Sequence, residues 1–122
     1  MLEVVVGALM ARILLIEDDK ATRYATAKLL SAAGYEVVEA NDYRDALPLL
    51  EDGSRIDVLV VDVVLPGVHG FALARMARMK HHRLKCIHVT GFDLPTSEAS
   101  GPVLRKPLND GQLLAEIATA LS

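Results

Sequence analysis

The chain has 122 residues, of which 52% are hydrophobic, and this is enough for one domain with its own core. Its net charge of −3 and its 4% of aromatic residues argue against direct binding of nucleic acid through bulk positive charge or base stacking. No run reaches the ~18 consecutive apolar residues of a membrane-spanning helix, so no membrane contact is expected. The single cysteine, Cys86, cannot form an internal disulfide, which favours a cytoplasmic location.

Short apolar runs predict the strands in chain order. Residues 11–16, 56–61 and 86–89 give the clearest runs, and weaker patterns lie at residues 35–40 and 103–105. Near-continuous Val, Ile and Leu suit strands that are buried on both faces of a parallel sheet.

Most of these runs are separated by segments in which apolar residues recur at helical spacing. This spacing predicts helices at residues 19–33, 42–51, 69–79 and 109–121, with Asp42 and Asn109 as N-caps and a kink or shortening at Pro48. The alternation predicts an α/β, flavodoxin-like (βα)5 fold with a parallel sheet in the order 2-1-3-4-5 and helices on both faces.

The connection between the last two strands departs from this pattern. Eleven residues, 91–101, separate Thr90 from Pro102, and they include Gly91, Pro95 and Gly101. A crossover with its helix needs about 10–12 residues at minimum. We therefore expect the fourth helix to be short, absent or mobile.

Chemically active side chains follow the predicted strands. Glu17 and Asp18 follow the first strand, Asp62 the third and Lys106 the fifth, and Thr90 ends the fourth. Parallel strands end at one edge of a sheet, so these side chains are expected to meet there. Three carboxylates held close together repel one another, and a cation relieves this repulsion. Mg²⁺ suits such a site because it prefers oxygen ligands. A lysine and a hydroxyl beside the metal make a phosphoryl pocket, in which an aspartate can be the nucleophile.

Each of these residues also has a simpler interpretation. Asp62 could cap a helix, Thr90 could be an ordinary strand end, and Lys106 could be a solvated surface lysine. Asp18 and Asp19 could both be helix N-terminal acids favoured by the dipole, and for Asp19 we prefer that interpretation. Their convergence at one edge favours a site.

With these motifs in place, the sequence resembles the receiver domains of response regulators in two-component signalling. The resemblance covers about residues 11–122 and rests on ILLIEDD, VVDVVLPGVHG, Thr90 and LRKPL, in this order. Residues 10–122 are then the receiver domain, and residues 1–9 an N-terminal extension. The extension is either an upstream start or an added edge strand that pairs with another chain.

The resemblance implies a role for each residue of the cluster. Asp62 would be the phosphoacceptor, and Glu17 and Asp18 would bind Mg²⁺ with the backbone carbonyl of Val64. Thr90 would hydrogen-bond the phosphoryl group, and Lys106 would pair with Asp62. The family also implies a cis Lys106–Pro107 bond and a turn at Pro66 and Gly67. It usually has an aromatic residue three positions before the lysine, where this chain has Val103, which we interpret as a core strand residue.

The resemblance therefore predicts a stand-alone response regulator. A histidine kinase or phosphotransfer protein would supply the phosphoryl group, and an unknown downstream protein would receive the signal by contact. It would not be an enzyme beyond assisting its own phosphorylation and dephosphorylation. The alternative is a degenerate receiver that acts as a phosphorylation-independent binding module or homodimer. A phosphotransferase or phosphatase for a separate substrate ranks last, because Val64 stands where a second acid/base aspartate would be.

Two further features lie outside this cluster. A basic run without acids is interpreted first as a solvated helix face and second as a partner-docking patch. Its members are Arg75, Arg78, Lys80, His81, His82, Arg83 and Lys85. His88 is expected to be a core histidine with satisfied hydrogen bonds, and Cys86 a small buried residue.

Overall fold

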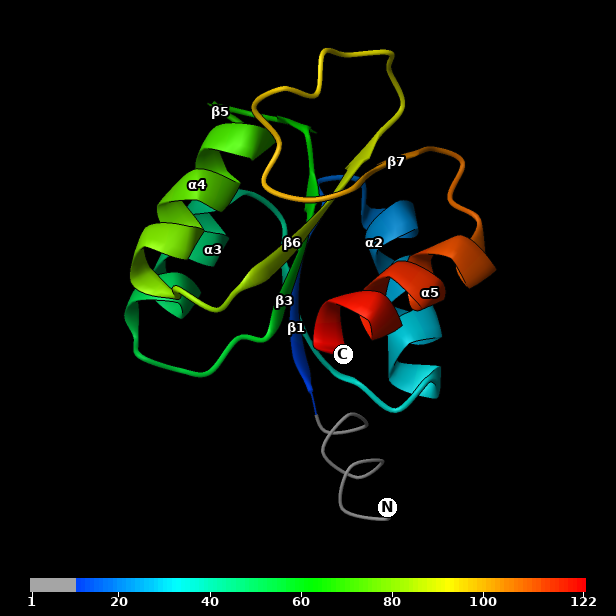
Figure 1. Cartoon of the computed structure of the whole chain (residues 1–122), viewed down its shortest axis with the longest axis horizontal. Coiled ribbons are helices and arrows are strands. Elements are labelled where there is room, and N and C mark those ends of the chain that lie inside the picture. Colours follow the sequence, from blue (N-terminus) through cyan, green and yellow to red (C-terminus); the bar gives the residue numbers. More distant parts are fainter. Residues whose placement is uncertain (1–10) are drawn as a thin grey trace.

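A five-stranded parallel sheet forms the centre of the computed structural model, which describes residues 11–122. The predicted extension, residues 1–9, lies outside the described residues. The strand order is β2-β1-β3-β6-β7, which confirms the predicted 2-1-3-4-5 order (Figure 1). The strands are β1 (Arg12–Ile16), β2 (Glu36–Ala40), β3 (Val58–Asp62), β6 (Lys85–Thr90) and β7 (Val103–Arg105).

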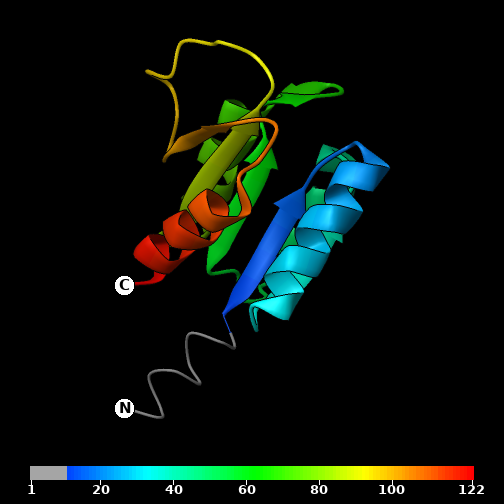
Figure 2. The same ribbon diagram turned by 90° about the vertical axis from the view of Figure 1, so that its right-hand side faces the viewer.

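Helices cover both faces of this sheet. In Figures 1 and 2, α2 and α5 lie on one face and α3 and α4 on the other. Their bounds are α2 (Lys20–Ala32), α3 (Tyr43–Glu51), α4 (Gly70–Lys80) and α5 (Asp110–Leu121). None of the helices in residues 11–122 has the length and apolar character needed to cross a bilayer.

Side chains cap the start of each of these helices. Asp42 accepts hydrogen bonds from the backbone N–H groups of Arg44 and Asp45, and Asn109 accepts one from Gln112, as predicted. Pro48 lies inside α3, which nevertheless continues to Glu51, so of the expected kink or shortening the shortening was wrong. Without an N–H, Pro48 removes a hydrogen bond to the carbonyl four residues earlier, but the rest of the helix persists.

Alternate residues of each central strand face opposite helical layers. In β1, Leu14 and Ile16 pack into the core under α3 and α4, whereas Ile13 and Leu15 pack into the core under α2 and α5. All four are at most 3% exposed. This burial on both faces explains why the strands read as continuous apolar runs.

The segment from residue 91 to residue 102 contains no helix, so of the predicted short, absent or mobile fourth helix the absent form is observed. The chain returns to the sheet at Gly101, where a Cβ atom would lie 1.8 Å from the carbonyl oxygen of Cys86. The next residue, Pro102, accepts a hydrogen bond from the N–H of His88. Only a glycine permits this approach of two backbones.

A short antiparallel hairpin follows β3, and the sequence patterns did not predict its strands. It consists of β4 (Val64–Leu65) and β5 (Val68–His69). Pro66 and Gly67 form the turn, as the resemblance implied, and Gly67 has a φ of 81°. Pro followed by a glycine with positive φ is the signature of a type II turn.

His88 differs from the expectation of a satisfied core histidine. Its Nε2 accepts a hydrogen bond from the N–H of Ser100, but its buried Nδ1 has no partner within residues 11–122. The ring lies edge-on against Phe71 of α4, with the ring centres 4.7 Å apart. Burial lowers the pKa of His88 to about 4. Cys86 is buried as expected, and burial raises the pKa of its thiol to about 11.

Candidate functional site

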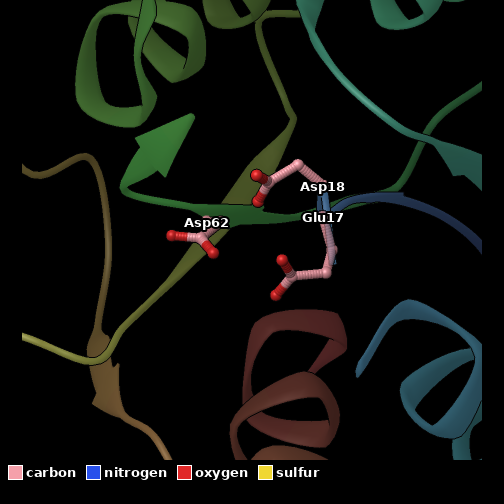
Figure 3. Close-up of side chains that lie close together, drawn as sticks. All are labelled: Glu17, Asp18 and Asp62. Atoms are coloured by element: carbon pink, nitrogen blue, oxygen red, sulfur yellow. The ribbon is translucent and has the colours of Figure 1, made fainter. Parts of the chain in front are cut away.

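Three carboxylates from two strands meet at the carboxyl edge of the sheet. Glu17 and Asp18 directly follow β1, and Asp62 is the last residue of the adjacent strand β3. One potential ligand oxygen from each of the three lies within 4.8 Å of the others. Figure 3 shows their side chains grouped in one place. The sequence prediction that strand order would bring these residues together is confirmed.

The carboxylate of Asp62 is held at both oxygens. The N–H of Val64 donates to Oδ1 at 2.9 Å, and Nζ of Lys106 donates to Oδ2 at 2.7 Å. Asp62 is only 7% exposed. Behind it, Gly70 approaches so closely that a Cβ there would lie 2.2 Å from the Asp62 carbonyl oxygen. The backbone packing therefore fixes where this carboxylate stands.

Lys106 bridges two carboxylates. Besides Asp62, its Nζ donates to Oε1 of Glu17 at 2.6 Å. Burial alone would lower the pKa of Lys106, but the hydrogen bonds to Asp62 and Glu17 outweigh it and raise that pKa. The Lys106–Pro107 peptide bond is cis, as the resemblance implied. The resemblance implied the contact with Asp62 but not the second contact with Glu17.

Glu17 is the most constrained acid of the cluster. It is 4% exposed, and its Oε2 accepts a hydrogen bond from the N–H of Asp19 at 3.0 Å. Burial, together with the charge of Asp62, raises the pKa of Glu17, although the hydrogen bonds from Lys106 and Asp19 act against this rise. Arg23 of α2 donates to the backbone carbonyl of Glu17 at 2.8 Å. No sequence motif indicated this support from Arg23.

The two neighbouring aspartates separate into different roles. Asp18 is exposed and belongs to the carboxylate cluster. Asp19 caps α2 by accepting hydrogen bonds from the N–H and hydroxyl of Thr22, which lower the pKa of its carboxyl. The preferred interpretation of Asp19 as a helix N-terminal acid is therefore confirmed.

Thr90 stands at the end of β6, next to β3 in the sheet. Its hydroxyl is buried and accepts a hydrogen bond from the N–H of Phe92 at 3.1 Å. Its carbonyl accepts a hydrogen bond from the N–H of Lys106 at 2.8 Å, which ties the last two strand ends together. Val103 lies in strand β7 as expected, but it is half-buried rather than part of the core.

The donor set suits a hard divalent cation. Three carboxylates and one ammonium group, that of Lys106, meet here, so negative charge is in excess. Mg²⁺ prefers such oxygen ligands and retains several waters. The exposed Asp18 leaves one side of the cluster open for them.

Comparisons with known proteins agree with this geometry. The family model described as "Response regulator receiver domain" matches residues 13–118. The response regulator receiver protein CpdR of Brucella abortus is 36% identical over 118 residues, which cover 92% of this chain and 98% of CpdR. The chain therefore belongs to the response regulator receiver domain family, and it is a receiver domain of two-component systems.

Solved structures show the same fold. The receiver domain of the hybrid histidine kinase CckA has a TM-score of 0.81 and 34% identity, covering 92% of this chain and all of that one. The response regulator TrrA of Thermotoga maritima, solved in complex with Mg(2+)-BeF, has a TM-score of 0.79 and 27% identity, covering 91% and 99%. This chain spans between 12% and 50% of the length of several other curated relatives.

Proposed function

We propose that Asp62 is the phosphoacceptor of this receiver domain. The observation behind this proposal is the placement of its carboxylate, which is buried, bonded to Lys106 and grouped with two further carboxylates. A histidine kinase or a histidine phosphotransfer protein would supply the phosphoryl group, in the cytoplasm. The membership of the chain in the receiver family supports this donor class.

The proposed reaction is a displacement at phosphorus. A carboxylate oxygen of Asp62 attacks the phosphorus of phosphohistidine, the P–N bond breaks, and the imidazole leaves with the bonding electrons. The product is an acyl phosphate on Asp62. Lys106, already 2.7 Å from Asp62, neutralises charge on the phosphoryl oxygens. Thr90 accepts a hydrogen bond from Phe92 at its oxygen, so its own O–H can be donated to a phosphoryl oxygen.

We further propose that Glu17, Asp18 and Asp62 hold Mg²⁺, with the backbone carbonyl of Val64 as an additional ligand. When bound, the ion supplies positive charge that offsets the carboxylates and the incoming phosphoryl group. The complex of the related TrrA with Mg(2+)-BeF supports this assignment. Lys106 and the metal would then share Glu17 and Asp62 as partners.

The output of the phosphorylated domain is proposed to be a changed contact with another protein. The domain acts on its own carboxylate rather than on a separate substrate. Val64, the residue two positions after Asp62, cannot act as a second acid or base. This interpretation keeps the domain as a signalling component rather than an enzyme.

Phosphorylation by a small acyl phosphate tests the proposal. The protein is incubated with acetyl phosphate, with and without Mg²⁺, and the intact mass is measured. We expect a Mg²⁺-dependent gain of one phosphoryl group, which disappears in Asp62→Asn and persists in the surface control Asp110→Asn. The variant Asp18→Asn is expected to need more Mg²⁺. If neither acetyl phosphate nor a phosphorylated histidine kinase modifies the wild type, the phosphorylation-independent binding module is the better interpretation.

A further inference from the structure

A groove runs along α4 where it faces the helix-free segment of residues 91–101, and we call it the α4 groove. Its first half is a hollow of about 340 Å³ whose lining includes Phe71, Ala72, Leu94 and Pro95. Its second half is a more open hollow of about 300 Å³, lined by Arg75, Arg78, Met79, His82 and Ser100. Arg75 lines both hollows, so the two halves adjoin.

The missing fourth helix explains why the groove exists. A right-handed crossover from β6 to β7 would place a helix beside α4, on the sheet face that α3 and α4 cover. Irregular chain takes that place, and Figure 1 shows it looping beyond the end of α4. The flank of α4 is thus left beside a loop rather than beside a packed helix.

The groove has a distinct chemical character in each half. The first half has apolar side chains on both of its walls, beside the polar His69, Ser97 and Glu98. The second half belongs to the basic run, in which residues 75–85 carry five Lys and Arg and no acid, within a chain whose net charge is −3. Arg78 forms no ion pair within residues 11–122. Met79 is 76% exposed, and methionine adapts readily to different binding partners.

One ion pair crosses the middle of the groove. Arg75 of α4 and Glu98 of the segment lie 3.2 Å apart, and their side chains are 51% and 72% exposed. An exposed pair of this kind is weak. A carboxylate from another molecule can therefore replace Glu98 on Arg75 at little cost.

We propose that the α4 groove is a docking site for an acidic amphipathic helix of a partner protein. Apolar side chains of that helix would contact Leu94 and Pro95, and its carboxylates would pair with Arg75 and Arg78. The helix would lie where the domain lacks its own, in the manner of other helix-in-groove complexes. Glu98 in the groove wall disfavours a nucleic acid. This docking goes beyond the proposed phosphotransfer and does not require Asp62.

A designed peptide tests the proposal on the full chain. The probe is a fluorescein-labelled helical peptide with Leu at i, i+4 and i+7 and Glu at the flanking positions, and fluorescence anisotropy gives its Kd at physiological ionic strength. We expect Arg78→Glu to weaken binding by roughly 5–10-fold, because an exposed ion pair with the peptide is lost and two like charges then repel each other. The control Lys28→Glu makes the same charge change on α2, across the sheet, and is expected to change the Kd less than twofold. Asp62→Asn should bind like the wild type.

Two further measurements separate the possible outcomes. Amide chemical shifts should change around Ala72, Arg75 and Leu94 when the Glu peptide is added, and not when a Lys-for-Glu peptide is added. Equal weakening by Arg78→Glu and Lys28→Glu would overturn the proposal, because the attraction would then be general. Tighter, Arg78-dependent binding of duplex DNA or of phosphatidylglycerol vesicles would also overturn it. Thermal unfolding of each variant verifies that the fold is retained.

Discussion

The carboxyl edge of the sheet and the segment of residues 91–101 lie next to each other but are held in different ways. Asp62, Thr90 and Lys106 sit on or directly beside paired strands, and the backbone bond from Lys106 to Thr90 ties two strand ends together. The segment has no strand or helix, and exposed ion pairs such as Arg75–Glu98 connect it to its surroundings. Reactive groups that need fixed positions thus lie on or beside hydrogen-bonded strands. The exposed surface of the segment lies outside those strands.

The two regions also differ in how charge is buried. At the carboxylate cluster, charged groups are buried together, and the pKa of Glu17 is raised. At the base of the segment, a neutral ring is buried, and the pKa of His88 is lowered to about 4. Lowering the pH therefore favours the folded state through Glu17 and disfavours it through His88.

Substitution of two glycines, one in each region, has the largest expected effect on stability. A Cβ at residue 70 would collide with the Asp62 carbonyl, and one at residue 101 with the Cys86 carbonyl. Backbone atoms cannot move aside easily, so Gly70→Ala and Gly101→Ala should each lower the free energy of unfolding by about 3 kcal/mol, the upper end of the cost of overpacking. Urea unfolding measures this loss.

Phosphorylation of these two variants then distinguishes the regions. Gly70→Ala moves the strand end that holds Asp62, so its folded fraction should accept the phosphoryl group from acetyl phosphate more slowly. Gly101→Ala should react at the wild-type rate once corrected for the folded fraction. Equal slowing in both variants would mean that the segment is part of the reactive site.

The pH dependence of stability probes His88. The unfolded state takes up the proton near pH 6.5, whereas the folded state does so only near pH 4. Stability is therefore lost as the pH falls from 6.5 to 4, by up to about 3 kcal/mol for this group. His88→Gln retains an acceptor for the N–H of Ser100 and does not titrate. Urea unfolding between pH 4 and 6.5 should show a flatter profile for this variant, and parallel profiles would contradict the assignment.

Binding of Mg²⁺ at the carboxylate cluster should stabilise the folded state by a smaller amount than the titration of His88 changes it. At an ion concentration ten times the Kd, binding to the folded state alone adds about 1.4 kcal/mol. The folded-state pKa of Glu17 is raised, so without metal its contribution to stability falls as the pH rises above its ordinary value of 4.5. The metal effect should therefore be largest at neutral pH and fade on acidification. Thermal unfolding with and without Mg²⁺ measures it, and Glu17→Gln should reduce it.

The sequence predicted those features that depend on strand order. Because parallel strands end at one edge, Glu17, Asp62 and Lys106 could be placed together from their positions after apolar runs. The length and glycines of residues 91–101 likewise predicted the missing helix. The hairpin of two-residue strands was missed, because alternation needs at least four residues to be recognised. The unpartnered Nδ1 of His88 and the second contact of Lys106 depend on side-chain packing, for which the sequence has no periodic signal.

The smallest expected effect comes from the ion pair that crosses the α4 groove. Glu98→Gln removes the charge that faces Arg75 on an exposed surface, so the free energy of unfolding should change by less than about 0.5 kcal/mol. The rate of phosphorylation by acetyl phosphate should not change. The affinity for the acidic helical peptide should rise about twofold, because Arg75 becomes available to it. Asp93→Asn makes the same charge change in a second exposed ion pair of the segment, with Arg105 outside the groove, and serves as the matched control with no gain in affinity. A change in phosphorylation rate with Glu98→Gln alone would show that the groove and the carboxylate cluster are coupled, and the separation between the two regions would then fail.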